Sequence, residues 1–104
     1  NSAATSQPSG SLCYVPAKKN KYIQESTFLA KNILAATSNL STSSKLITTK
    51  DRGIWVIESV NMPAVLLECG YITNANDVAI VKTKTDELAA KMLDGIETYL
   101  KNQK

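Results

Sequence analysis

The run Pro63-Ala64-Val65-Leu66-Leu67-Glu68 is an apolar stretch that ends in a carboxylate. We expect 64–68 to be a strand that is apolar on both faces, a pattern typical of sheets covered by helices on both sides. Glu68 is followed by Cys69-Gly70-Tyr71-Ile72. With largely apolar neighbours on both sides in the sequence, its side chain is hard to place in bulk water. A buried carboxylate is costly unless it is paired or functional. Glu68 is therefore the first candidate for a chemical centre, although the residues alone leave a structural role equally open.

Hydrophobic periodicity outside this run predicts an α/β architecture, with a sheet of three to four strands flanked by helices. Residues 1–10 are expected to be a loop, and 11–104 to be structured. We expect further strands at 11–15, 46–48 and 53–58, and helices at 23–38, 77–82 and from 83 to the end.

Three local features refine these expectations. The five residues 59–63 are too few for a parallel crossover, so strands 53–58 and 64–68 are either antiparallel neighbours or not adjacent. Asn76 is the expected N-cap of the short helix, and Thr83 and Asp86 have the spacing of a capping box for the last one. Gly95, inside that helix, predicts close packing against the sheet.

A second glutamate, Glu58, also ends a predicted strand. Ser59 and Asn61 continue into a polar turn, so we favour a surface role for Glu58. In a hairpin it would lie roughly 15 Å from Glu68. The paired carboxylates of glycosidases lie only about 5 to 10 Å apart, which disfavours an acid/base pair.

The other polar and aromatic candidates are weaker. Arg52 could bind a substrate carboxylate, but we favour a surface charge before the turn at Gly53. The aromatic residues Tyr14, Trp55 and Tyr71 are expected in the core or at its rim. Cys13 and Cys69 could pair or serve as small apolar residues.

Composition excludes several classes of function. The 104 residues carry a net charge of +3 and no histidine, which rules out a Ser-His-Asp triad or a histidine metal site within this chain. Lys18, Lys19 and Lys21 form a basic loop without the interleaved aromatics of a nucleic-acid site. No stretch is apolar enough to span a bilayer. The chain begins at Asn1 without Met, and we expect it to be a processed or excised piece of something longer.

A family resemblance covers nearly the whole chain from Gly10 onward. PAVLLECGYITNANDVAIVK (63–82) and LAAKMLDGIETYL (88–100) resemble the closing segment of the zinc-dependent N-acetylmuramoyl-L-alanine amidases. The helix containing Ser26, Leu29 and Ala30 and the Arg52-Gly53 pair resemble earlier parts of the same domain. The resemblance implies that 1–104 is the C-terminal portion of one catalytic domain with a larger, mixed six-stranded sheet.

The resemblance also implies a reaction, the cleavage of the amide between N-acetylmuramic acid and L-alanine. In the family, a zinc held by two histidines and a glutamate activates water, and a second glutamate, which falls on Glu68, is the general base. Asn1-Ser2-Ala3 resembles the end of a zinc-binding run and would place its histidine two residues before Asn1. We therefore expect the isolated chain to bind no catalytic zinc and to be inactive. Arg52 and Asn1 are weak candidates for substrate binding.

The implied substrate is peptidoglycan, and the implied location is the cell envelope, periplasmic or extracellular. A partial sheet should expose apolar surface, so we expect pairing with the missing N-terminal half or swapping with a second copy. The alternative is a non-catalytic module, derived from an amidase, that binds the cell wall or a partner chain. A third possibility is an unrelated α/β domain in which the glutamate-centred run is coincidental.

Overall fold

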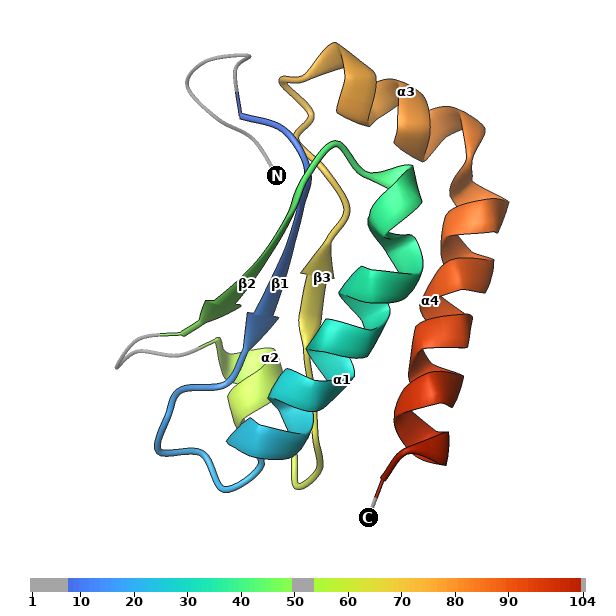
Figure 1. Cartoon of the computed structure of the whole chain (residues 1–104). Coiled ribbons are helices and arrows are strands. Elements are labelled where there is room, and N and C mark those ends of the chain that lie inside the picture. The colour runs from blue at the N-terminus through green and yellow to red at the C-terminus, as the bar shows by residue number, and fades with distance from the viewer. Residues whose placement is uncertain (1–7, 50–53, 104) are drawn as a thin grey trace.

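The computed structural model describes residues 8–49 and 54–103, so the candidates Asn1 and Arg52 lie outside it. The chain folds as α/β, as predicted (Figure 1). Its elements in order are β1 (Ser11–Val15), α1 (Ile23–Thr37), the 3₁₀ turn η1 (Ser38–Leu40), β2 (Ser44–Thr48), α2 (Trp55–Glu58), β3 (Leu66–Glu68), α3 (Ala75–Thr83) and α4 (Thr85–Lys101). None of the described helices is long and apolar enough to cross a membrane.

The described strands form one mixed sheet in the order β2-β1-β3. β1 and β2 are parallel, and α1 makes the crossover that parallel neighbours require. β3 runs antiparallel to β1 on the other side, with Leu12 opposite Glu68 and Tyr14 opposite Leu66. The central strand is thus β1, and β3 lies at an edge of the described sheet.

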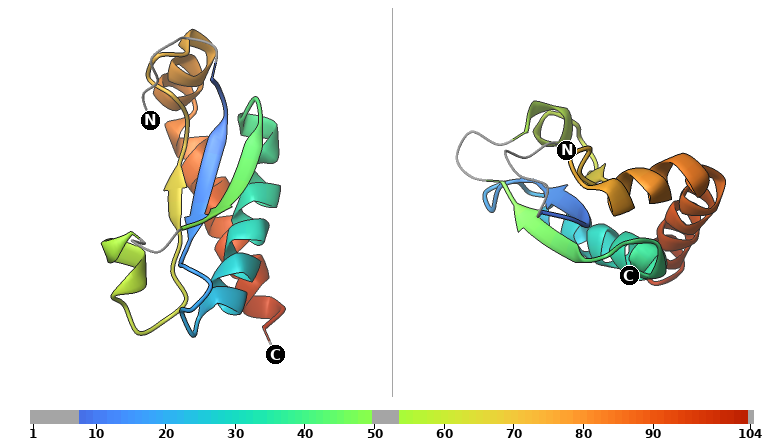
Figure 2. Two further views of the ribbon diagram at one scale, coloured as in Figure 1. Left: turned by 90° about the vertical axis from the view of Figure 1, so that its left-hand side faces the viewer. Right: turned by 90° about the horizontal axis from the view of Figure 1, so that it is seen from above.

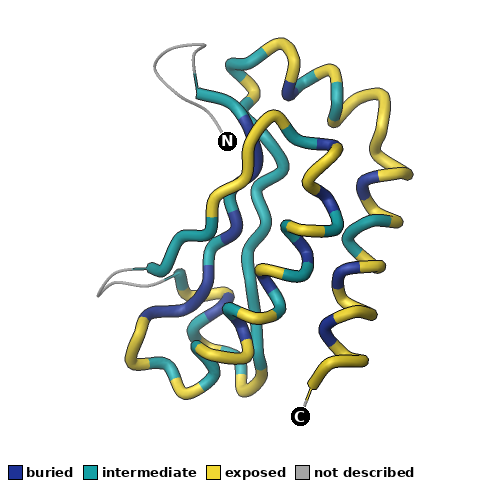
Figure 3. Tube along the Cα trace, in the orientation of Figure 1, coloured by how far each residue is buried: buried dark blue, intermediate teal, exposed yellow. Residues whose placement is uncertain are grey.

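The core lies between the sheet and α1. Burial alternates along β1, as expected for a strand with one covered face. Cys13, Val15 and Ala30 form the buried cluster, and Leu46 and Leu67 from the neighbouring strands pack against it. α4 packs on α1 as an outer layer, and its far side is exposed (Figures 2 and 3).

This layering corrects the expectation for Gly95. The residue is buried at a close contact, but its neighbour is α1 and not the sheet. A Cβ placed on Gly95 would lie 2.7 Å from the Cα of Ile33. Glycine is therefore needed there because two helix backbones approach one another.

The prediction of a strand at 53–58 is wrong. The described part of that segment contains the helix α2, so no hairpin with 64–68 exists, and β3 pairs with β1 instead. A short apolar run has no periodicity that separates a strand from a helix. Only Ile57 of α2 is buried. Trp55 is 81% exposed, so the expectation that it lies in the core or at its rim is wrong.

The helix ends also differ from the predicted ones. Asn74, not Asn76, caps α3, and its side chain accepts a hydrogen bond from the backbone N–H of Asp77. α3 continues to Thr83, whose hydroxyl donates to the carbonyl of Ala79 in the preceding turn. The capping box of Thr83 therefore does not form, because its hydroxyl already serves the helix before it.

Candidate functional site

Glu68 is the last residue of β3 and lies opposite Leu12 of β1. Successive side chains on a strand point to opposite faces. Leu67 packs against the core beneath α1, so the side chain of Glu68 is on the other face, which α1 and α4 do not cover. We call this the open face of the sheet; it also carries Leu12 and Tyr14.

The carboxylate of Glu68 has an oxygen without a partner. Among the described residues, Oε2 of Glu68 is shielded from solvent and accepts no hydrogen bond. Buried polar atoms of this kind are uncommon in native proteins, because leaving one unpaired costs about 1 to 3 kcal/mol. An uncompensated acceptor at the end of a strand is suited to take a proton from a bound molecule.

Two tyrosines, Tyr14 and Tyr71, line the open face. Tyr14 lies on β1, and Tyr71 follows β3 by three residues; both are half-buried, as expected for rim aromatics. Burial raises the pKa of Tyr14, and the neighbouring charges of Glu68 and Tyr71 raise it further. The open face therefore combines a carboxylate with the phenol of Tyr14, whose raised pKa keeps it protonated at neutral pH.

A hollow of about 390 Å³ lies on the open face of the sheet. It lies over β1 and β2 and reaches Tyr71 in the loop after β3. Its walls include Leu12, Tyr14, Ser43, Lys45, Ile47 and Tyr71. This hollow has the aromatic and polar lining of a binding site, and Leu12 in its wall is the cross-strand neighbour of Glu68.

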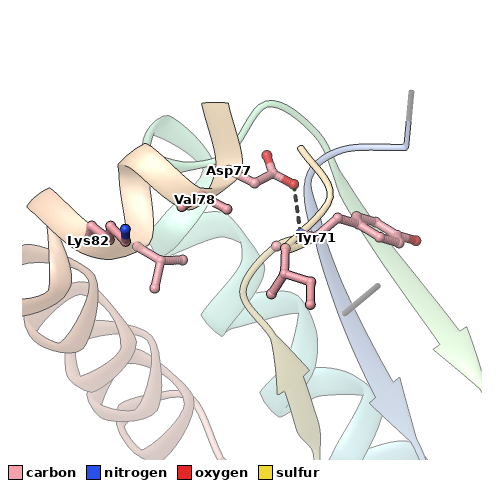
Figure 4. A pocket seen from close by; sticks show the side chains of 7 residues that line it. Tyr71, Asp77, Val78 and Lys82 are labelled. Carbon is pink, nitrogen blue, oxygen red and sulfur yellow. Dashed lines mark hydrogen bonds between the residues drawn. The ribbon is translucent and has the colours of Figure 1, made fainter. Parts of the chain in front are cut away.

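Asp77 fixes the segment that follows Glu68, a role that the sequence analysis missed. The side chain is buried, and its Oδ2 accepts hydrogen bonds from the backbone N–H groups of Gly10 and Tyr71, each at 2.9 Å. The bond to Tyr71 is visible in Figure 4. The only local signal is the spacing of Asn74 and Asp77, which is typical of a helix cap.

Gly70 has no side chain, which allows the carboxylate of Asp77 to approach the loop after β3. A Cβ on Gly70 would lie 2.9 Å from the Cβ of Asp77. Gly10 has a φ of +97°, and a Cβ there would collide with the backbone oxygen of Ser43 at 2.4 Å. Both glycines thus let Asp77 tie the start of β1 to the loop that carries Tyr71.

A second hollow, of about 230 Å³, lies between this loop and α3 (Figure 4). Its walls are mainly apolar, with Ile72, Val78 and Val81 among them. Asp77 also borders it, but its carboxylate is already bonded to backbone N–H groups. The second hollow therefore lacks a free group for hydrolysis, and the chemistry of this chain is better placed at Glu68.

Glu58 is separate from this site. Its carboxylate accepts hydrogen bonds from Ala17 N–H at 2.7 Å, Thr49 Oγ1 at 3.0 Å and Asn20 Nδ2 at 3.1 Å. The bond from Ala17 is the main reason why the pKa of Glu58 is lowered. Glu58 is half-buried, and these bonds give it a structural role, because it fastens α2 to the loop after β1 and to the residue that follows β2.

The cysteines are free thiols. Cys13 is part of the core, and burial raises its pKa to about 11. Burial also raises the pKa of Cys69. Of the two alternatives from the sequence, pairing is wrong, and the raised pKa values keep both thiols protonated at neutral pH.

The side chains that the structure describes do not fit a zinc site. No group of three His, Cys, Asp or Glu side chains that could hold a metal occurs among residues 8–49 and 54–103. Zinc in proteins is held by three or four such ligands, and the full sequence contains no histidine.

Comparison with known proteins identifies relatives of this arrangement. The family model described as N-acetylmuramoyl-L-alanine amidase (Amidase_3) matches residues 1–98. No protein of curated function matches the sequence.

Several solved structures share the fold. The CwlD amidase from Clostridioides difficile, solved in complex with the GerS lipoprotein, is 24% identical with a TM-score of 0.80; the match covers 99% of this chain and 52% of that one. The catalytic domain of CwlV, an N-acetylmuramoyl-L-alanine amidase from Bacillus (Paenibacillus) polymyxa var. colistinus, is 28% identical with a TM-score of 0.74, covering 99% and 55%. Ami1, an N-acetylmuramyl-L-alanine amidase from Mycobacterium smegmatis, is 21% identical with a TM-score of 0.81, covering 98% and 51%. The chain spans about half the length of these structures.

Proposed function

Because the chain belongs to the N-acetylmuramoyl-L-alanine amidase family, we propose that it forms the part of a peptidoglycan hydrolase that carries the general base, Glu68. The observation that supports this role is the shielded Oε2 of Glu68, which lacks a hydrogen-bond partner among the described residues. Leu12, the cross-strand neighbour of Glu68, lines a hollow large enough for part of a substrate.

The proposed reaction is hydrolysis of the amide between N-acetylmuramic acid and L-alanine. Glu68 takes a proton from a water molecule as the water oxygen bonds to the carbonyl carbon. The C–N bond then breaks, and the proton passes to the leaving nitrogen. The second proton of the water leaves the new carboxyl group for the same nitrogen, so the products are the carboxylate of N-acetylmuramic acid and the ammonium form of L-alanine.

Zinc is typical of this family, and it would polarise the scissile carbonyl. The side chains described above do not supply its ligands. We propose that these ligands come from residues that precede Asn1, in the half of the domain that this chain does not span. The 104 residues alone are then expected to be inactive.

The edge strand β3 is the proposed junction with that half. Among the described strands, β3 has a neighbour only on the β1 side. A free edge offers backbone N–H and C=O groups to another strand. We propose that the preceding half, or the same segment of a second copy, pairs there, and that the assembled enzyme acts on peptidoglycan in the cell envelope.

The test is a hybrid domain in which this chain follows the N-terminal half of the CwlV catalytic domain. With zinc bound, the hybrid should release peptide from N-acetylmuramoyl-peptides, whereas the 104 residues alone should not. Intact substrate after incubation with the zinc-loaded hybrid would contradict the proposal. Measurable hydrolysis by the 104 residues alone would contradict the assignment of the ligands to another segment.

One observation favours a second candidate, a non-catalytic module that binds the cell wall. The chain has no histidine, and its described residues have no group that could hold a metal. Such a module would bind purified peptidoglycan without cleaving it, even when joined to the metal-binding half. Co-sedimentation with peptidoglycan and assay of the supernatant for released peptide distinguish the two functions.

A further inference from the structure

The strand register brings a cation onto the face that carries Glu68. Leu12 of the central strand lies opposite Lys45 on β2 and opposite Glu68 on β3. The three residues form one row across the sheet, so their side chains share a face. Neighbouring strands lie about 4.8 Å apart, which places the Cα atoms of Lys45 and Glu68 roughly 10 Å from each other.

Lys45 is available to bind an anion. It is exposed, and it lines the hollow on the open face together with Tyr14, Ile47 and Tyr71. No hydrogen bond or ion pair of Lys45 with another described side chain is found, so its ammonium group is not neutralised by a neighbour in that part of the chain. The hollow thus contains an exposed cation, and Glu68, with its unpaired carboxylate oxygen, lies in the same cross-strand row as that cation.

We propose that this hollow is a subsite for the peptide part of the substrate, in which Lys45 binds a carboxylate and Tyr14 and Tyr71 contact the peptide. The proposal rests on the proposed function, because the scissile amide must lie at Glu68. The proposal assigns a role in substrate specificity to Lys45, which lies on β2, a strand without a proposed catalytic residue.

The dimensions and the charges agree with a short acidic peptide. An extended peptide advances about 3.3 to 3.6 Å per residue. A carboxylate one to three residues beyond the scissile amide therefore falls within reach of Lys45, whose long side chain spans the remaining distance. A charged hydrogen bond to a carboxylate is about twice as strong as a neutral one, so loss of the carboxylate charge should weaken binding.

The test compares two ligands that differ by one charge. N-Acetylmuramoyl-L-alanyl-D-glutamate and its D-isoglutamine amide are titrated into the 104-residue chain, and Kd is followed by NMR. We expect the acid to bind about 5- to 30-fold more tightly than the amide, in line with a charged hydrogen bond. Lys45→Ala should remove this preference without changing the Kd of the amide, and Lys45→Arg should retain much of it.

Lys31→Ala is the matched control, because Lys31 is exposed on α1, away from the hollow. It should leave the preference intact. Equal affinity for the two ligands, or an unchanged preference in Lys45→Ala, would overturn the subsite and leave the role of Glu68 standing. Absence of binding by both ligands would overturn the subsite and count against the proposed function as well.

Discussion

The carboxylate of Asp77 accepts a hydrogen bond from the backbone N–H of Gly10 at 2.9 Å, although 67 residues separate the two. The same oxygen accepts from Tyr71. One buried side chain therefore joins the start of the central strand to the loop that follows Glu68. The geometry of the open face depends on this connection.

Replacing Asp77 tests that connection. Asp77→Asn keeps the size of the side chain but removes its negative charge, which weakens the two hydrogen bonds that Oδ2 accepts from buried backbone N–H groups. We expect the free energy of unfolding to fall by about 1 to 3 kcal/mol, measured by urea denaturation. Asp94→Asn, at an exposed position of α4, should change it by less than about 0.5 kcal/mol. Equal effects of the two substitutions would contradict the anchoring role.

Because Gly95 contacts Ile33, we expect Gly95→Ala to change the stability of the fold in the direction opposite to that expected from helix propensity. Gly→Ala inside a helix normally stabilises it by about 1 kcal/mol. Here the added methyl group would meet the backbone of α1, so Gly95→Ala should destabilise the fold by about 1 to 3 kcal/mol. Thr98→Ala, exposed on the same helix, should stabilise it by a few tenths of a kcal/mol. A more stable Gly95→Ala variant would show that the helices are not in close contact.

Glu58 should make stability depend on pH. The hydrogen bond from Ala17 N–H lowers its pKa in the folded state below the ordinary value of 4.5. The stabilisation that the ionised Glu58 provides is thus complete above pH 4.5. It is lost as the pH falls through the lower pKa that Glu58 has in the folded state. Glu58→Gln should flatten this acid limb of a plot of Tm against pH. An unchanged acid limb would mean that Glu58 does not carry the pH dependence.

The proximity of Glu68 to Tyr14 can be measured without catalysis. Burial, followed by the charge of Glu68, raises the pKa of Tyr14. Glu68→Gln removes that charge, so the pKa of Tyr14 should fall towards its ordinary value; it is followed by NMR of the labelled tyrosine ring. Glu97→Gln, at an exposed site on α4, should leave it unchanged. If Glu68→Gln also leaves it unchanged, the two side chains are not neighbours.

Sequence reasoning succeeded where a pattern was long or had distinct boundaries. β1 ends before Pro16, and α1 has apolar residues at helical spacing, so both were predicted closely. α2 was missed because its four residues are too few to show a period, and its position depends on the carboxylate of Glu58 binding Ala17 across the fold.

The candidate site shows the same division. Glu68 stood out because a charge follows an apolar run. Lys45 gave no signal, because its position relative to Glu68 depends on the register of two strand pairs. Asp77 could not be assigned as an anchor, since its partners Gly10 and Tyr71 meet it only in the folded chain.

The most direct test of the central claim is the effect of Glu68→Gln on kcat in the zinc-loaded hybrid domain. Glutamine keeps the shape of the side chain but cannot take a proton at neutral pH. With Glu68 as the general base, kcat for cleavage of the N-acetylmuramoyl-L-alanine bond should fall by about 10² to 10⁴-fold, with zinc content unchanged and with Glu97→Gln fully active. A Glu68→Gln variant that binds zinc and retains the kcat of the unsubstituted hybrid would contradict the assignment.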